Sequence, residues 1–350
     1  MSPPHVRTLP VAYANLPGWA ADDHLAAFTA FCASDGGEDP SAALKAVCAR
    51  ALAEVPHITT AEHARAFFEA HFTPHRVDHD GPGGLLTGYY EPVIDGSLTY
   101  APPFVVPVYR RPADLENCVA ESERGAKSAG FTHMRRTAQG LEPYATRQAI
   151  EQGALACQGL ELCFLADPVD AFFLHVQGSG VIRLGDGVPL RITYDGKNGH
   201  PYSSIGRTLI DDATFAPDSL TLQALGDWLR ADLVGARTVM WRNESFVFFR
   251  ELAGDTPVGV LGTPLHPGRS LAVDTAFQTL GRPIYVSAPT MTHVGPQGFH
   301  RLMIAHDVGS AIKGPERGDI YFGTGPQALA LAGVTKHAGV FFVLIPKDAP

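Results

Sequence analysis

The sequence predicts a mainly β protein with peripheral helices, closer to a barrel than to a doubly wound sheet. From Leu85 onward the chain consists of short apolar runs broken by Gly and Pro at irregular spacing, which is typical of strands. Few helical patterns interrupt these runs, so the regular alternation of strand and helix that marks a parallel α/β sheet is missing. The 350 residues, 45% of them apolar, can form one large domain or two ordinary ones.

The first 75 residues are expected to be helical. Asp22 or Asp23 can cap one helix, and Asp39 followed by Pro40 can begin a second. Thr59 and Glu62 have the spacing of a capping box for a third. Apolar side chains at helical spacing predict that these helices pack on a core: Leu25, Phe28, Phe31, Cys32, Leu44, Val47, Cys48, Leu52, Phe67, Phe68 and Phe72.

The predicted strands follow from Leu85 to the end of the chain. In order they are LLTGYYEPVI, PFVVPVY, DAFFLHVQGSGVIRL, PLRITY, SFVFFRE, LAVD, PIYVSA, RLMIAHD, DIYFG and GVFFVLIP. Helices are expected at 146–152, 218–230 and 326–332. The polar segments 110–140 and 252–268 are expected to be loops or boundaries.

Charge and hydropathy exclude several classes of partner. The formal charge is −9 and no long Lys/Arg run occurs, which argues against a nucleic acid or an anionic membrane as the main partner. No apolar run approaches the roughly 20 residues of a membrane span. The opening residues lack the basic and apolar regions of a signal peptide, so an export signal is expected to be absent from this chain or replaced by another route.

Neither a metal site nor a cofactor is expected. The cysteines have no zinc-like spacing, and the 15 histidines include no HExxH motif. Cys32 and Cys48 lie on consecutive predicted helices and could form a disulfide in an oxidising compartment, with buried free thiols as the alternative.

Three aspartates near the C-terminus are the strongest candidates for chemistry. Asp274, Asp307 and Asp319 each stand at the edge of an apolar strand, with Lys313 in the turn between the last two. If these strands are neighbours, repulsion and burial can raise one carboxyl pKa enough for a proton donor near neutral pH. The alternative is that each aspartate caps a turn.

Longer motifs around these aspartates resemble a known family. IAHDVGSAIKGPERGDIYFGTG, with GRSLAVD upstream, is similar to the barrel of the membrane-bound lytic transglycosylase A (MltA) family and to the wider three-aspartate (3D) domains of cell-wall enzymes. The blocks GYYEP, FFLHVQGSGVIRL, YDGKNGHPYSSIGR and SFVFFRE resemble family blocks in the same order. The resemblance covers the chain from residue 85 to its end.

The resemblance implies a double-psi β-barrel with peripheral helices, plus an inserted second β-domain that forms a groove with it. The barrel would comprise residues 1–102 and 243–350, and the insert residues 103–242. The implied activity is that of a murein lytic transglycosylase, a carbon–oxygen lyase that cleaves the β-1,4 bond between N-acetylmuramic acid and N-acetylglucosamine and leaves a 1,6-anhydromuramyl end. Asp319 would be the single acid/base, supported by Asp307 and Asp274.

Further polar residues in the family-like blocks are expected to bind the glycan. The alternatives are a core role for Tyr89 and Tyr90, a tight turn for Gln177 and Ser179, and anchoring of the loop for Lys313. They are Tyr89, Tyr90, Glu91, Gln177, Ser179, Lys197, Asn198, Tyr202, Ser203 and Lys313.

The expected partner is the glycan strand of peptidoglycan, bound by a periplasmic monomer. Wall-remodelling proteins could be further partners, and a native lipid anchor, not visible in this chain, could attach the protein to the outer membrane. Two other functions remain open. One is a glycoside hydrolase in which Asp307 activates water, and the other is a non-catalytic, expansin-like module that binds the wall.

Overall fold

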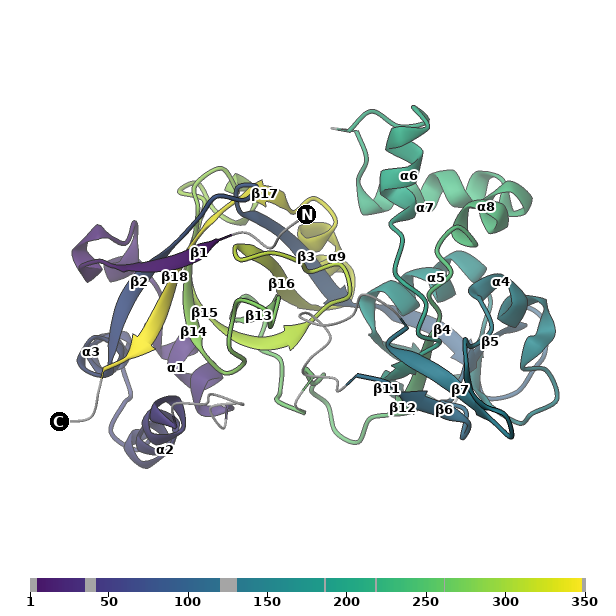
Figure 1. The fold of residues 1–350 in the computed structure, drawn as a ribbon, viewed down its shortest axis with the longest axis horizontal. Coiled ribbons are helices and arrows are strands. Elements are labelled where there is room, and N and C mark those ends of the chain that lie inside the picture. Colours follow the sequence, from purple (N-terminus) through teal and green to yellow (C-terminus); the bar gives the residue numbers. More distant parts are fainter. Residues whose placement is uncertain are drawn as a thin grey trace.

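The computed structural model describes residues 5–34, 42–119, 131–185, 187–217, 219–260 and 262–347. Two β-rich bodies lie side by side, each with its own helices (Figure 1). The N-terminal helices and the last strands belong to the same body, and the middle of the chain forms the other. In the described ranges, none of the helices has the combination of length and hydropathy that crossing a bilayer requires.

The first body is a curled sheet that forms the predicted barrel. Two of its neighbouring pairs, β13 with β15 and β16 with β3, are parallel, and the others are antiparallel. A core cluster of aliphatic, Met and Phe side chains fills it. Its strand order is β1 (Val6–Pro10), β2 (Phe72–His79), β18 (Val340–Pro346), β14 (Pro283–Ala288), β15 (Phe299–Val308), β13 (Ser270–Val273), β16 (Arg317–Thr324), β3 (Leu85–Glu91) and β17 (Lys336–Ala338).

Helices from the N-terminal segment cover the outside of this barrel, as predicted, but Leu52, which was expected to pack on the core, is exposed. Asp23 caps the first of them by accepting a hydrogen bond from the backbone N–H of Ala26. The third is capped by Thr60 rather than by Thr59, because the Thr60 hydroxyl reaches the N–H of His63. The predicted start at Asp39 and Pro40 lies outside the described residues. The helical segments here are η1 (Tyr13–Asn15), η2 (Trp19–Ala21), α1 (His24–Cys32), α2 (Ala43–Glu54), α3 (Ala61–His71), η5 (Thr292–Val294) and α9 (Pro326–Ala332).

The disulfide considered for Cys32 and Cys48 is not formed. Both residues are thiols, on α1 and α2. They pack as small apolar groups within or against the aromatic cluster that joins the helices to the barrel. Burial raises the pKa of the Cys32 thiol to about 11.

The second body is built on another sheet, flanked by helices. Its strand order is β12 (Val247–Glu251), β11 (Leu190–Lys197), β10 (Ser179–Arg183), β4 (Val93–Ser97), β9 (Glu161–Leu165) and β5 (Val106–Tyr109). A small sheet, β6 (Leu115–Asn117), β7 (His133–Thr137) and β8 (Gly140–Glu142), occupies part of the segment expected to be a loop. The helical segments are α4 (Arg147–Ala149), η4 (Ile150–Ala154), α5 (Pro168–Gln177), α6 (Ile205–Asp211), α7 (Leu222–Ala231) and α8 (Leu233–Met240).

One predicted strand was wrong. The first half of DAFFLHVQGSGVIRL is helix α5, and only its second half is strand β10. Asp167 caps this helix, Pro168 occupies its first turn, and Gly178 ends it at φ 82°. The helix is buried on most of its faces, so its sequence lacks the polar stripe that distinguishes a surface helix from a buried strand.

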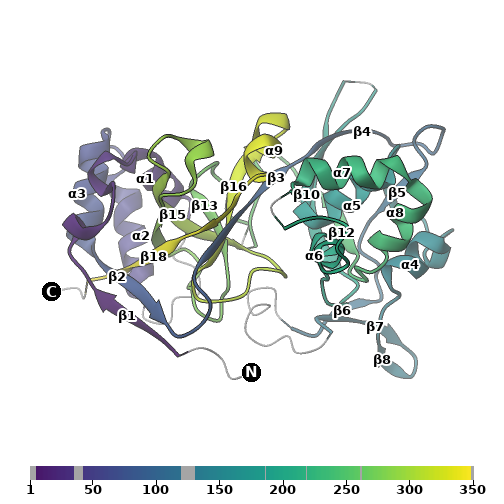
Figure 2. The same cartoon turned by 90° about the horizontal axis from the view of Figure 1, so that it is seen from above.

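The sheet to which each strand belongs shows where along the chain one body ends and the other begins. β3 runs out of the barrel and the chain continues as β4 in the second sheet (Figure 2). β4 and β12 both lie on the barrel side of the predicted boundaries at 102/103 and 242/243, yet both pair with strands of the second sheet. We therefore propose boundaries near Pro92 and Leu252 instead.

Candidate active site

Strand pairing brings Asp307 and Asp319 to the same edge of the barrel. β13 lies between β15 and β16, and its Ala272 is in register with both aspartates. Two strand spacings put their Cα atoms about 10 Å apart. The predicted convergence of these two carboxylates is therefore a consequence of the sheet order.

Asp319 is held by residues that the sequence analysis missed. The Thr87 hydroxyl donates a hydrogen bond of 2.5 Å to Asp319 Oδ1, and Arg317 Nη2 donates to the same hydroxyl oxygen at 2.8 Å. Burial raises the pKa of the Asp319 carboxyl, against the opposing effects of the Arg317 charge and the Thr87 hydrogen bond. Because its side chain is still partly exposed, Asp319 can exchange a proton with a bound ligand.

The strand period could have found these two residues. Thr87 precedes Tyr89 by two positions and Arg317 precedes Asp319 by two, so each pair shares a face of its strand. The parallel register then sets Thr87 opposite Asp319. What the sequence does not contain is the pairing of β3 with β16, which lie more than 200 residues apart.

Asp307 has a different set of partners. Tyr89 donates its hydroxyl to Asp307 Oδ2 at 3.0 Å, and the backbone N–H of Val308 donates to Oδ1 at 2.9 Å. Burial is the main reason that the pKa of Asp307 rises to about 6, and the negative charge of Asp319 adds to the rise. Burial and the charge of Asp307 raise the pKa of the Tyr89 phenol, which therefore remains a hydrogen-bond donor.

Asp274 is buried and bonded to the backbone of a turn. It is 3% exposed and accepts hydrogen bonds from the backbone N–H groups of Ala276 and Gly314. It thereby fixes the turn that carries Lys313, whose own side chain is exposed. Burial lowers the pKa of Lys313, and the charge of Asp274 acts in the opposite direction. Asp274 thus caps this turn, which is the alternative considered for each of the three aspartates.

The second body contributes a polar loop to the site. Lys197, at the end of β11, donates to the Ser310 hydroxyl of the barrel at 3.2 Å. Burial raises the pKa of Tyr202, and the charge of Asp319 adds to this rise, so the Tyr202 phenol lies near the candidate acid. Ser203 is exposed beside it. The loop from 198 to 204 therefore faces the barrel edge that bears Asp319.

Asn198 holds this loop from inside and is not available to a ligand. It is fully buried, its amide nitrogen donates to the carbonyls of Ala145 and Glu244, and its oxygen accepts from the N–H of Phe246. The predicted glycan contact of Asn198 is thus wrong, because every polar atom of its side chain is used within the protein.

Gly199 is required where the loop passes β7. Its φ is +83°, and a Cβ there would lie 2.0 Å from the carbonyl oxygen of His133. We expect Gly199→Ala to lower the free energy of unfolding by about 2–4 kcal/mol, since strain and overlap add. Gly187→Ala is the matched control, with the same φ of +83° and nothing within 4 Å. Urea denaturation measures both, and equal losses would show that the contact with His133 is unimportant.

Tyr90 and Glu91 also differ from their predicted roles. Tyr90 is 7% exposed and lies on the face of β3 opposite Tyr89. Glu91 is fully buried between Arg191 and Thr324. Neither side chain is placed to bind a glycan at Asp319.

Gln177 and Ser179 lie where α5 ends and β10 begins. Gln177 Oε1 accepts a hydrogen bond from the backbone N–H of Tyr90 at 3.0 Å. Ser179 is half-buried and pairs with Thr193 on β11. Gln177 therefore supports the connection between the two bodies, whereas Ser179 lies within the sheet of the insert. In the ranges described, no group of three His, Cys, Asp or Glu side chains could hold a metal ion.

The fold and the site define a class: a two-domain β protein with a carboxylate-based site where a polar loop of the insert meets the edge of a barrel. Family comparisons narrow this class. The profile described as "MltA specific insert domain" matches residues 85–250, and the profile described as "3D domain" matches residues 269–345.

Individual relatives agree with these matches. Membrane-bound lytic murein transglycosylase A of Vibrio cholerae is 36% identical over 273 residues, which are 76% of this chain and 66% of that protein, slightly under two thirds of its length. The crystal structure of membrane-bound lytic murein transglycosylase from Agrobacterium tumefaciens is 35% identical, covers 97% of both chains and superposes with a TM-score of 0.87. Escherichia coli MltA with bound chitohexaose is 28% identical, with a TM-score of 0.69 over 100% of this chain and 96% of that one. The chain belongs to the MltA family of membrane-bound lytic murein transglycosylases.

Proposed function

We propose that this protein is a peptidoglycan lytic transglycosylase with Asp319 as its single acid/base. The observation that carries the proposal is the environment of Asp319, a partly exposed carboxyl whose pKa is raised by burial and whose orientation is set by Thr87. An acid of this kind is what cleavage of a glycosidic bond requires. The names of the relatives and the chitohexaose bound to the Escherichia coli protein support a glycan substrate.

The reaction follows from a single carboxyl group. Protonated Asp319 donates its proton to the oxygen of the β-1,4 bond between N-acetylmuramic acid and N-acetylglucosamine, and positive charge develops at the muramyl C1. The carboxylate left on Asp319 then takes the proton of the muramyl C6 hydroxyl, which attacks C1 and closes the 1,6-anhydro ring. No second base is needed because the nucleophile belongs to the substrate, and its attack is intramolecular.

Asp307 assists this cycle through charge. The charge of ionised Asp319 helps to raise the pKa of Asp307. Because the interaction of two charges is reciprocal, ionised Asp307 also disfavours ionisation of Asp319, and the two carboxyls titrate as a coupled pair. Tyr89 keeps Asp307 in place through its hydrogen bond. Tyr202 is half-buried and lies near Asp319, Ser203 is exposed next to it in the chain, and Lys313 is exposed on the turn between Asp307 and Asp319; we assign the sugar contacts to these three.

Product analysis tests the proposal. Digestion of purified murein is expected to yield muramyl ends with 1,6-anhydro rings, which mass spectrometry separates from hydrolytic ends by the mass of one water. Reducing muramyl ends would instead assign the chain to the hydrolases, with Asp307 activating water. Glycan binding without released product would assign it to the non-catalytic wall-binding modules.

The proposed substrate indicates the compartment in which the protein acts. We propose a periplasmic monomer that acts on glycan strands, in line with the membrane-bound relatives. Attachment to the outer membrane through a lipid anchor and contact with wall-remodelling proteins are parts of the same proposal.

A further inference from the structure

One face of β3 connects the catalytic edge of the barrel to the insert. Side chains alternate along a strand, so Thr87, Tyr89 and Glu91 point to the same side. The first contacts Asp319, the second contacts Asp307, and the third contacts Arg191 of the insert. Glu91 thus lies on the Asp319 side of the strand, about 13 Å further along it than Thr87.

Glu91 is a buried carboxylate shared by both bodies. Its side chain has no exposed surface, and it forms an ion pair with Arg191 on β11. Thr324, at the end of β16 in the barrel, donates to the same carboxylate at 2.7 Å. Among the described residues the other oxygen, Oε1, finds no hydrogen-bond donor. A buried carboxylate with incomplete hydrogen bonding is costly, which indicates a role other than stability.

Arg191 and Lys197 anchor β11 to the barrel at both ends of the strand. Arg191 binds Glu91, and six residues later Lys197 binds Ser310 in the turn after Asp307. The strand between them spans about 20 Å. The loop that bears Tyr202 follows directly, so the position of β11 sets the distance of Tyr202 from Asp319.

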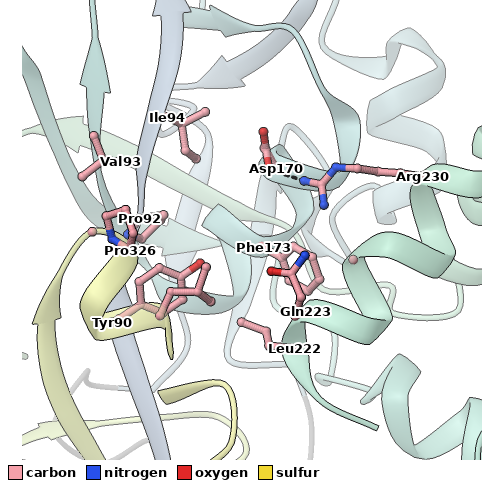
Figure 3. Close-up of a pocket in the computed structure, with 13 residues that line it drawn as sticks. Tyr90, Pro92, Val93, Ile94, Asp170, Phe173, Leu222, Gln223, Arg230 and Pro326 are labelled. Carbon is pink, nitrogen blue, oxygen red and sulfur yellow. Dashed lines mark hydrogen bonds and ion pairs between the residues drawn. The ribbon is translucent and has the colours of Figure 1, made fainter. Parts of the chain in front are cut away.

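Behind β3, on the Tyr90 side, the two bodies are packed together only in part. On this side, an open pocket of about 160 Å³ separates α9 and the β3–β4 connection from α5 and α7. In Figure 3, Tyr90, Pro92 and Pro326 line one wall, with Phe173, Leu222 and Gln223 opposite. Leu222 of α7 still packs against the cluster of Tyr90, Ala328 and Ala332, so the pocket reduces the apolar contact between the two bodies without removing it.

We propose that Glu91 and Arg191 form an interdomain clamp that positions the insert over Asp319. They are positioning residues, since they act through β11 and Tyr202 and touch no substrate. The expected effect of the clamp on turnover rests on the proposed function. The fixed spacing of the two bodies is independent of that function.

Interdomain distances test the clamp directly. In a Cys118→Ser background, nitroxide labels are attached at the exposed Cys157 of the insert and at a Leu52→Cys substitution on the exposed side of α2. Double electron–electron resonance of the full chain then reports the spacing of the two bodies. Glu91→Gln is expected to broaden the distance distribution, and turnover of soluble glycan strands should fall about 10- to 100-fold, as for a misplaced catalytic site.

A double variant separates positioning from stability. Glu91→Gln leaves Arg191 buried without a counter-charge, whereas Glu91→Gln with Arg191→Met removes both charges and should restore the melting temperature. The clamp predicts that the double variant keeps the broad distribution and the low turnover. If Glu91→Gln fails to fold, the distance distribution of the double variant alone tests the clamp.

Asp95→Asn provides the matched control, because the Asp95–Arg183 pair is exposed on the insert and joins only insert strands. It should leave the distribution unchanged. Narrow, wild-type distances in both Glu91 variants overturn the clamp. If the wild-type protein releases no glycan product, the proposed function fails while the distance measurement still tests the clamp.

Discussion

Asp319→Asn is expected to reduce turnover by about 10³-fold or more, because it removes the only group assigned to proton transfer. Asparagine keeps the shape of the side chain and can still accept the hydrogen bond of Thr87, so folding and affinity for the glycan should persist. The loss should therefore appear in kcat rather than in KM.

Release of anhydromuramyl products from murein measures turnover, calorimetry with chitohexaose measures affinity, and thermal melting measures stability. Asp255→Asn, at an exposed carboxylate on the loop after β12, is the control and should behave as the wild type. Substantial activity remaining in the Asp319→Asn protein would contradict the single-acid assignment.

Asp307→Asn is expected to change stability and activity in opposite directions. Turnover should fall by about 10²-fold, less than for Asp319, because Asp307 acts on the acid without exchanging the proton itself. The pKa of Asp307 is about 6 in the folded protein, against an ordinary value of 3.8. Between these two values the folded state binds more protons than the unfolded state, so the stability of the wild type falls as pH rises through this window.

Asparagine does not ionise, so the variant does not lose stability as the pH rises. The variant should therefore exceed the wild type in stability above pH 6 by about 1–3 kcal/mol, and the difference should vanish below about pH 4. Urea denaturation at a series of pH values measures it. Asp211→Asn, in an exposed ion pair with Arg207, serves as the control. A stability difference that does not depend on pH would show that burial of the Asp307 charge is not its cause.

The sequence predicted much of the fold because its signals are local. Apolar runs at irregular spacing located most of the strands, and caps at Asp23 and near Thr60 located helices. The segment that became α5 was assigned wrongly because a helix buried on most faces carries no periodic polar signal. The pairing of β4 and β12 with strands of the second sheet could not be read from the sequence, since each pairs with partners distant in sequence.

The sequence by itself determined which strand edges carry Asp307 and Asp319, and with the family motifs it singled out Asp319 as the acid. Only the tertiary structure decided what surrounds each polar side chain. It pairs Thr87 with Asp319, and it buries Glu91 against Arg191 and Asn198 beneath its own loop. The physical reason is that strand and helix patterns depend on neighbours in sequence. Burial and pKa depend on the dielectric surroundings and hydrogen bonds that distant segments bring together.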